Sequence, residues 1–331
     1  NTYRERLHSM YRFLHELCRD SGEPPNMGDR DDGYVLNLGE LPDEPQALLA
    51  VGAALFEDPQ LAAPVPSETV FWLFGHRQQT DMPAVKKSVS VSFPKSGYHL
   101  LRSDRLSVFF DCAELGYGPI AAHGHADCLS LTLAVDGQPV FVDPGTYDYF
   151  SHPEWRNYFR ETRAHNTAEV DRRSQSRILG PFIWGQRASA RLTEWEDDDV
   201  RSIVAGQHDG YAKLEDPVIH TRRVRLDKKA DTISVVDNFS ATAAHTIRLH
   251  FHIQPGLVVR RVSANEVVLE LAGSVLHVSA ADASIRCVRA DENTKLGWIS
   301  SRYHEKQASI CLQIEKTTCG NAEIRTDFRL Q

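Results

Sequence analysis

The stretch LSLTLAVDGQPVFVD, residues 129–143, decides the fold class. Apolar and other side chains alternate along its first half, and such a two-residue period is typical of a β-strand. The residues that would share one face are Leu129, Leu131, Leu133 and Val135. Asp136-Gly137 then stands between two apolar runs, which is a strong signal for a tight hairpin. The stretch therefore predicts two antiparallel strands joined by a short turn.

The same period recurs from about residue 88 to the end of the chain. Further strands are expected at 89–93, 106–111, 188–194, 218–226, 232–237, 246–253, 257–262, 266–271, 274–279, 308–315 and 322–329. So many evenly spaced strands predict stacked antiparallel sheets. We expect a mainly β protein in which residues 88–331 form a large antiparallel β-sandwich.

Residues 1–87 have a different, mainly helical pattern. Apolar residues recur at steps of three and four over 3–18, and helical signals return at about 45–57. Ser67 is placed to cap a further helix over 68–75. Between the first two helices, NMGDRDDGYVLNL (26–38) predicts a polar loop that enters a short extended segment. A short helical segment is therefore expected before the sandwich.

Composition excludes several classes of protein. The 331 residues are 41% hydrophobic and 25% charged, as in globular proteins. A formal charge of -8 argues against a nucleic-acid partner, and no apolar run is long enough to span a membrane. The six cysteines lack a CxxC pair, which favours buried thiols and leaves one disulfide open. The chain begins with neither Met nor a signal peptide, so we interpret it as a fragment or processed form.

Residues 117–177 hold an unusual density of metal donors. The imidazoles and carboxylates concerned belong to His123, His125, Asp127, Asp143, His152 and His165. Three such donors and a water would complete a tetrahedral zinc site. Asp143 ends an expected strand before Pro144-Gly145, where a turn would hold its carboxylate rigidly. The alternative is that these are ordinary surface or core histidines, since fifteen histidines occur in the chain.

The same region mixes aromatic and basic residues. The rings are those of Tyr147, Tyr149, Trp155, Tyr158 and Phe159, and the guanidinium groups those of Arg156, Arg160, Arg163, Arg172, Arg173 and Arg177. Arginine binds carboxylate or sulfate through two parallel hydrogen bonds, and flat rings stack on sugar faces, so the pattern suits an acidic polysaccharide. Alternatively, the rings belong to the core and the arginines pair with nearby acids.

HGHADCLSLTLAVDGQPVFVDPGTYDYF (123–150), followed by WRNYFRETRAHNT (155–167), resembles the core signature of the heparinase II/III-like family. The resemblance covers essentially the whole chain, as the C-terminal portion of such a protein. Members cleave acidic polysaccharides by β-elimination, using an α/α toroid followed by antiparallel β-sheets. The resemblance thus implies that residues 1–87 are the end of a toroid, and that 26–38 join it to the sandwich.

The resemblance also implies roles for individual residues. His125, Asp143 and His165 would be ligands of a mainly structural zinc. His123 would be a catalytic histidine, and Tyr147, Tyr149 or Tyr158 would supply a catalytic tyrosine. From the chemistry of their side chains, Arg156 or Arg160 is expected to hold substrate anions, and Trp155 to stack on a sugar. The family's toroid tyrosine, and the Asn/His pair that neutralises the substrate carboxylate, lie upstream of the joining segment and are expected to be absent here.

Three functions remain to be distinguished. The first is the C-terminal part of a lyase that acts on a uronate-containing polysaccharide. The second is a zinc-containing module that binds glycan, or serves exopolysaccharide assembly, without turnover. The third is a cupin-like enzyme, whose metal would be iron or manganese. We expect an acidic polysaccharide as partner, consider a homodimer, and expect a periplasmic or secreted location with a cytoplasmic one left open.

Overall fold

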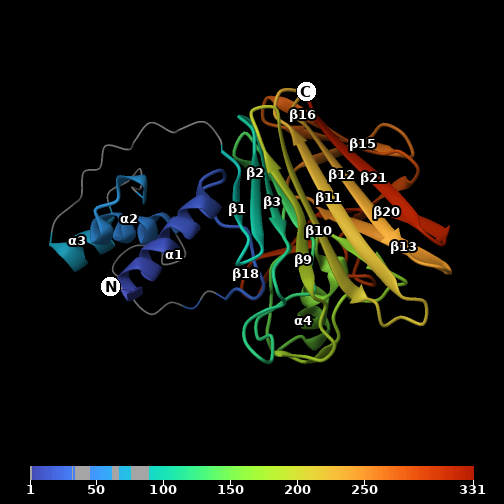
Figure 1. The fold of residues 1–331 in the computed structure, drawn as a ribbon, viewed down its shortest axis with the longest axis horizontal. Coiled ribbons are helices and arrows are strands. Elements are labelled where there is room, and N and C mark those ends of the chain that lie inside the picture. The colour runs from blue at the N-terminus through green and yellow to red at the C-terminus, as the bar shows by residue number, and fades with distance from the viewer. Residues whose placement is uncertain (1, 32, 34–44, 62–66, 76–88) are drawn as a thin grey trace. The chain divides into compact units, whose positions relative to one another are not determined.

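The computed structural model describes residues 2–31, 33, 45–61, 67–75 and 89–331 (Figure 1). The chain divides into two compact units. One consists of Asn1–Pro25 with Asp32–Lys87, and the other of Asn26–Asp31 with Ser88–Gln331. The short segment 26–31 therefore packs with the sheets and not with the helices that flank it in sequence.

The first unit is helical, as the sequence predicted. Its helices are α1 (Thr2–Cys18), α2 (Pro45–Phe56), the 3-10 helix η1 (Pro59–Leu61) and α3 (Glu68–Phe74). Ser67 caps α3, because its hydroxyl accepts a hydrogen bond from the Val70 N–H at 3.2 Å. None of the described helices is long and apolar enough to cross a membrane. The assignment of this unit to the end of a toroid stays a prediction.

The second unit begins with a five-stranded antiparallel meander. Its strands, in spatial order, are β1 (Val91–Phe93), β2 (Tyr98–Arg102), β3 (Leu106–Asp111), β4 (Leu131–Val135) and β5 (Gln138–Phe141). β4 and β5 form the predicted hairpin, in which Asp136 and Gly137 take φ values of 49° and 80°. Positive φ at both positions is what a tight hairpin turn requires.

Two further antiparallel sheets, one of eight strands and one of four, complete the sandwich. The eight-stranded sheet has the order β14 (Val258–Arg261), β15 (Glu266–Leu271), β16 (Ser274–Ala280), β21 (Ala322–Leu330), β12 (Thr232–Ser240), β11 (Val218–Asp227), β10 (Arg201–Tyr211) and β9 (Ala190–Asp197). The four-stranded sheet has the order β17 (Ser284–Arg289), β20 (Ile310–Cys319), β13 (Ala244–His252) and β6 (Ala168–Val170). The mainly β fold with a large antiparallel sandwich is confirmed.

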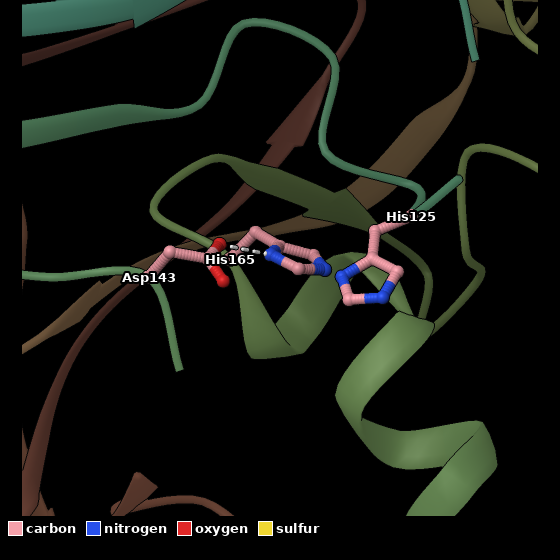
Figure 2. Close-up of side chains that lie close together, drawn as sticks. All are labelled: His125, Asp143 and His165. Carbon is pink, nitrogen blue, oxygen red and sulfur yellow. Dashed lines mark hydrogen bonds and ion pairs between the residues drawn. The ribbon is translucent and has the colours of Figure 1, made fainter. Parts of the chain in front are cut away.

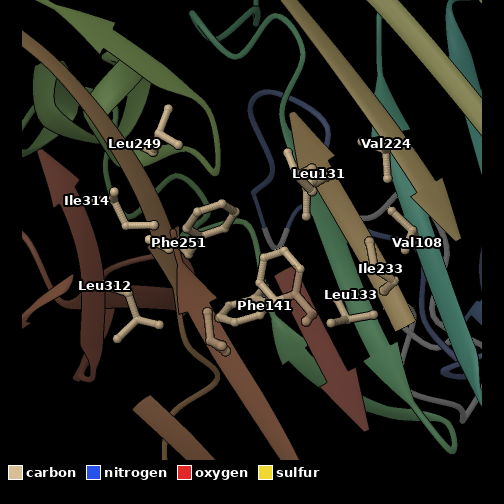
Figure 3. Close-up of a cluster of buried hydrophobic side chains, with 14 of the residues drawn as sticks. Val108, Leu131, Leu133, Phe141, Val224, Ile233, Leu249, Phe251, Leu312 and Ile314 are labelled. Atoms are coloured by element: carbon tan, nitrogen blue, oxygen red, sulfur yellow. The ribbon is translucent and has the colours of Figure 1, made fainter. Parts of the chain in front are cut away.

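The three sheets share one hydrophobic core (Figure 3). Phe141 belongs to the meander, Phe251 to the four-stranded sheet and Phe328 to the eight-stranded sheet. The centroids of these three rings lie 5.4 to 5.6 Å apart. Each ring is at most 1% exposed, and burying one contributes about 1.5 to 3 kcal/mol. This contact of three rings fixes the end of β5, after which Asp143 follows.

Shorter elements and loops gather at one end of the sheets, around α4 (Figure 1). They are α4 (Pro153–Arg160), the 3-10 helix η2 (Thr162–Ala164) and the hairpins β7 (Ile178–Gly180) with β8 (Ile183–Trp184) and β18 (Trp298–Arg302) with β19 (Glu305–Ala308). Trp155, Tyr158 and Phe159 of α4 pack against Val288 and Cys311, which anchors the helix. All six cysteines are free, four of them buried.

A buried ion pair ties these loops to the eight-stranded sheet. Arg222 and Asp237 are both 0% exposed, and Arg222 Nε donates to Asp237 Oδ1 at 2.7 Å. Arg222 Nη1 also donates to the backbone oxygens of Leu129 and Asn166, at 2.9 and 2.6 Å. His220 Nε2 donates to the same carboxylate at 2.6 Å. The sheet thus holds the backbone beside two of the predicted metal ligands in place.

Candidate metal and catalytic site

The three predicted metal ligands converge. His125 lies in the loop between β3 and β4, Asp143 follows β5, and His165 follows η2. All three are buried, and one donor atom from each lies within 4.8 Å of the other two. The hairpin brings Asp143 back toward the His125 loop, and a hydrogen bond from Arg222 holds the backbone of Asn166, next to His165. Residues 40 apart in the sequence therefore meet at one point.

Two imidazole nitrogens of this trio lack an ordinary hydrogen-bond partner within the part of the chain that the structure describes. His165 Nδ1 donates to Asp143 Oδ2 at 2.6 Å, and His125 Nε2 donates to Asp29 Oδ1 at 3.0 Å. When each of these nitrogens carries the hydrogen of a neutral ring, the other nitrogen has a lone pair. These are His125 Nδ1 and His165 Nε2; both are buried and make no hydrogen bond of ordinary geometry among the described residues, although the Phe159 carbonyl oxygen lies near His165.

The two rings face each other (Figure 2). Their centroids are 5.2 Å apart, and one nitrogen of each ring is turned toward the other ring. Buried acceptors left without a donor are rare, and each one costs stability. A divalent cation between the two lone pairs would satisfy both. The donor set of two imidazoles and a carboxylate fits zinc.

The surroundings of Asp143 keep its carboxyl group ionised. Burial alone would raise the pKa of Asp143, but the charge of His165 and its hydrogen bond lower it below the usual range. The Gly145 N–H also donates to Asp143 Oδ1 at 3.0 Å. Asp143 is therefore a carboxylate anion at neutral pH, as a metal ligand must be.

Asp29 is a site residue that the sequence analysis missed. Its carboxylate is 0% exposed and accepts hydrogen bonds from both terminal nitrogens of Arg156. The same carboxylate accepts from His125 Nε2 at 3.0 Å and from His123 Nδ1 at 3.2 Å. Burial would raise its pKa, but bonds from His125 and Arg156 hold that pKa well below the usual range. Asp29 thus links the metal trio to His123.

The backbone around Asp29 is fixed against the loop of His123. The Asp29 N–H donates to the His123 carbonyl oxygen at 2.8 Å. Gly28 has φ +72°, and a Cβ on it would lie 2.2 Å from that same oxygen. Only glycine fits so close an approach. Gly28 and Asp29 of the joining segment are therefore part of the site.

His123 and His125 take opposite environments, although only Gly124 separates them. The side chain of His123 is 59% exposed, and that of His125 is 0% exposed. His123 has φ +61°, which turns its side chain away from that of His125. Gly124 packs so closely on Gly116 that a Cβ would lie 2.6 Å from the Gly116 nitrogen. The structure thus provides one buried and one solvent-facing imidazole.

Of the three candidate tyrosines, the structure places Tyr149 beside His123. Their ring centroids are 6.4 Å apart, and Phe182 contacts both rings. Tyr149 Oη donates to Asp31 Oδ2 at 3.3 Å. Burial, with the charges of Asp29 and Asp31, raises the pKa of Tyr149. Its phenol therefore keeps its proton well above neutral pH.

Tyr147 and Tyr158 lie elsewhere. Tyr147 packs against Trp155 and Phe159 of α4, away from His123. Tyr158 is 0% exposed, and its hydroxyl contacts no polar partner among the described residues. The expectation that Tyr158 could act on substrate is wrong for this structure, because no substrate can reach a fully buried hydroxyl.

The three expected substrate-binding residues are also buried. Arg156 is 1% exposed and is occupied by Asp29, and Arg160 is 0% exposed beneath Asn157 and Gly180. Trp155 is 7% exposed in the cluster of α4. The expectation that they contact polysaccharide needs correction, since their polar groups or ring faces are used inside the protein. The alternative of a core ring holds for Trp155. Arg156 is paired with an acid, but with the distant Asp29, and Arg160 bonds backbone and amide oxygens in place of a carboxylate.

Comparison with known proteins identifies the fold. The model of the heparinase II/III-like C-terminal domain matches residues 86–326. The crystal structure of heparan sulfate lyase HepC from Pedobacter heparinus is similar over 99% of this chain and 47% of its own, at 16% identity and TM-score 0.72. A crystal structure of heparinase III is similar over 98% of this chain and 48% of its own, at 14% identity and TM-score 0.72.

This chain therefore spans about half the length of these lyases, as the 47% and 48% coverages show. No curated protein sequence matches it. The sandwich that carries the site is shared with the lyases, and the family expected from the HGHAD, VDPGTY and AHNT segments is confirmed. Since the family model matches well over half of its residues, this chain belongs to the heparinase II/III-like family.

Proposed function

We propose that this chain is the C-terminal part of a polysaccharide lyase that cleaves a uronate-containing polysaccharide by β-elimination. The observation that carries the proposal is the pairing of solvent-facing His123 with the buried carboxylate of Asp29, next to the three converging metal donors. Family membership and the similarity to structures titled heparan sulfate lyase and heparinase III support the reaction class.

Zinc is the metal we propose for the trio of His125, Asp143 and His165. The two facing imidazole lone pairs and the ionised Asp143 support this choice over iron or manganese, which favour more open sites with further oxygen donors. When bound, zinc would supply a fixed positive charge that rigidifies the loop between β3 and β4. His123 lies in that loop, so its position would depend on the site.

His123 is the proposed base. Its Nδ1–H donates to Asp29 Oδ2, so Nε2 carries the lone pair that can take a proton. The proton would come from the ring carbon next to the uronate carboxylate. Asp29 stabilises the imidazolium that forms, as the aspartate of a Ser-His-Asp triad stabilises its catalytic histidine.

Tyr149 is the proposed acid. As the proton leaves carbon, the C–H electron pair becomes a carbon–carbon double bond, and the bond from the next carbon to the glycosidic oxygen breaks. The departing oxygen needs a proton, and Tyr149 holds one because its pKa is raised. The substrate carboxylate must also be neutralised. We expect the groups that neutralise the substrate carboxylate in the part of a lyase that this chain does not span.

The test is product formation by the full-length protein. Each turnover yields a conjugated unsaturated uronate, so ultraviolet absorbance should rise when the protein meets heparan sulfate, hyaluronan or alginate. His123→Ala should abolish the rise yet keep zinc and the melting temperature. His125→Ala should lose zinc and stability. His277→Ala, outside the site, should change neither the zinc content nor the stability.

Two outcomes would contradict parts of the proposal. Glycan binding without any ultraviolet rise across the three polymers would favour the non-catalytic module instead. Equal zinc loss in His123→Ala and His125→Ala would refute the division of roles between the two histidines. Iron in place of zinc in the purified protein would favour the cupin-like reading.

A further inference from the structure

We infer that a polar cavity beside α4 binds a carboxylate or sulfate group of an acidic polysaccharide, at a distance from the candidate site. The inference rests on the proposed function only for the nature of the polymer. The cavity has a volume of about 610 Å³, and Arg173, Arg177 and Lys213 are among the residues that line it. We call it the basic cavity.

The three cationic side chains are available for a ligand. Arg173, Arg177 and Lys213 are exposed. No ion pair or hydrogen bond of their side chains occurs within the part of the chain that the structure describes. Free guanidinium groups bind carboxylate or sulfate through two parallel hydrogen bonds. Most other arginines of this region lack that freedom.

The contrast with those arginines is informative. Arg156 is bound to Asp29, Arg163 to Glu161 at 2.9 Å, and Arg160 is fully buried. The basic pattern between 156 and 177 therefore contains arginines bound inside the fold, the exposed Arg172, and two exposed arginines that line the basic cavity. Of these, Arg173 and Arg177 are the ones placed to meet a polymer in the basic cavity.

The backbone holds Arg173 and Arg177 in place. The Arg173 N–H donates to the Val170 carbonyl oxygen at 2.8 Å, at the end of β6. Arg177 exchanges two backbone hydrogen bonds, each of 2.8 Å, with Gly185 and Gln186. Rigid attachment lowers the entropy lost when the side chains engage a ligand. These are features of a formed site more than of a mobile surface.

Charge in the basic cavity is positive on balance. Two acids, Glu161 and Glu215, also line it. Glu161 is neutralised by Arg163, and burial raises its pKa. One unpaired carboxylate, that of Glu215, therefore faces three unpaired cations. An anionic sugar would be attracted although the whole chain carries a formal charge of -8.

A second cavity adjoins the basic cavity and is lined by Tyr149 of the candidate site. It has a volume of about 300 Å³, shares Asn157 and Ile178 with the basic cavity, and is lined by Tyr149 and Phe150. Tyr149 is the residue placed beside His123. Phe150 is 66% exposed, and a sugar face can stack on such a ring. One polysaccharide chain could therefore pass from His123 along Tyr149 to the basic cavity.

Arg160 adds a buried positive charge behind the wall of the second cavity. It lies under Asn157 and Gly180, which line the second cavity, and donates to Asn157 Oδ1 at 3.2 Å and to the Gly180 oxygen at 3.1 Å. Burial lowers the pKa of Arg160 to about 10, so it remains a cation at neutral pH. Its field would favour an anion in the groove without direct contact.

The experiment measures binding without turnover, in the His123→Ala background. The probes are heparin oligosaccharides of defined length, with unsulfated hyaluronan oligosaccharides of the same lengths to separate sulfate from carboxylate recognition. Arg173→Ala/Arg177→Ala should weaken binding of long oligosaccharides by about tenfold to a hundredfold, since two charge-assisted contacts are lost. Lys213→Ala should weaken it by about threefold. Disaccharides, too short to span both cavities, should be unaffected.

The matched control is Lys229→Ala/Arg286→Ala. Both residues are exposed on other parts of the sandwich, and the pair removes the same net charge as Arg173→Ala/Arg177→Ala. The control should change affinity by less than about twofold, because screened distant charges contribute little. Melting temperatures of all variants should match, since no lost side chain supports the fold.

Two results would overturn the inference. One is an equal loss of affinity in the control pair, which would mean general attraction by net charge. The other is unchanged binding of long oligosaccharides by Arg173→Ala/Arg177→Ala. The proposed lyase reaction is judged separately. A specific loss of binding in Arg173→Ala/Arg177→Ala, with no ultraviolet product from the full-length protein, would support the basic cavity and refute catalysis. Normal turnover, with binding unchanged in Arg173→Ala/Arg177→Ala, would support catalysis and refute the basic cavity.

Discussion

Asp29→Asn should destabilise the sandwich strongly and disturb the site. The substitution is nearly the same size, but it removes the negative charge and turns one oxygen into an N–H₂ group. Asp29 accepts from Arg156, His125 and His123, all of which present N–H donors. An amide nitrogen would therefore face donors, and the guanidinium of Arg156 would lose its counter-charge.

The magnitude follows from burial. The Asp29 side chain is 0% exposed and that of Arg156 is 2% exposed, so water cannot replace the lost partner. Removing one member of a buried ion pair costs about 3 to 5 kcal/mol. For a unit of this size each kcal/mol lowers the melting temperature by roughly 2 to 4 °C, so a decrease of about 6 to 20 °C is expected.

The assay is thermal and urea unfolding, with histidine NMR of His123 as a local reporter. Asp282→Asn, at an exposed carboxylate, is the control and should shift the midpoint little. Asp29→Leu/Arg156→Met should recover much of the loss, because it removes both buried charges together. A loss below about 1 kcal/mol in Asp29→Asn, or a double variant as unstable as the single one, would refute the reasoning.

Three further predictions follow from other contacts. Asp237→Asn strips the counter-charge from fully buried Arg222, so urea unfolding should show a loss of about 3 to 5 kcal/mol; a loss within experimental error would contradict the buried pairing. Gly28→Ala would place its Cβ 2.2 Å from the His123 oxygen, at φ +72°, so we expect a loss of about 2 kcal/mol or more and a changed His123 NMR signal; a wild-type signal would show that the segment is not held there. Burial would raise the pKa of Asp148, but backbone N–H groups hold that pKa at about 2. A lowered folded-state pKa adds stability above the unfolded pKa of about 3.9, and this stability disappears as pH falls toward 2. Acid should therefore destabilise the wild type more than Asp148→Asn, and parallel curves of stability against pH for the two proteins would contradict this.

Periodicity along the chain predicted most of the fold, because it reflects local backbone geometry. The alternation of Leu131, Leu133 and Val135 reports which face of β4 is buried, and Asp136-Gly137 can adopt the positive φ that the hairpin turn needs. Ser67 predicted the start of α3 for the same local reason, since a hydroxyl at that position can bond a nearby N–H. Such signals lie within a few residues of the structure they specify.

The convergence of the metal donors was predictable only through family resemblance. Spacing alone left His152 and Asp127 as equal candidates beside His125, Asp143 and His165. Which donors meet depends on the return of β5 toward the β3–β4 loop, and on the Arg222 bonds that hold residues near His165. Those are contacts between distant segments, and no local pattern encodes them.

Burial of the arginines could not be predicted either. Arg156 and Arg160 lie on the buried face of α4, whereas Arg173 and Arg177 lie in the exposed segment between β6 and β7. All four carry the same side chain, so the sequence gives no sign of which ones have a buried partner. The partner of Arg156 is Asp29, 127 residues earlier in the chain. A long-range ion pair of this kind is settled by tertiary packing alone.

The position of Asp29 has a consequence for how the site is assembled. The family domain match begins at residue 86, yet the carboxylate that contacts His125, His123 and Arg156 comes from the segment 26–31. One carboxylate thus bonds a proposed metal ligand, the proposed base and a buried cation. Metal binding, the proton affinity of His123 and stability should therefore be coupled, because any change at Asp29 alters all three. A double-variant cycle between Asp29 and Arg156 would measure the energy of that pair, and simple additivity would mean that these two residues act independently.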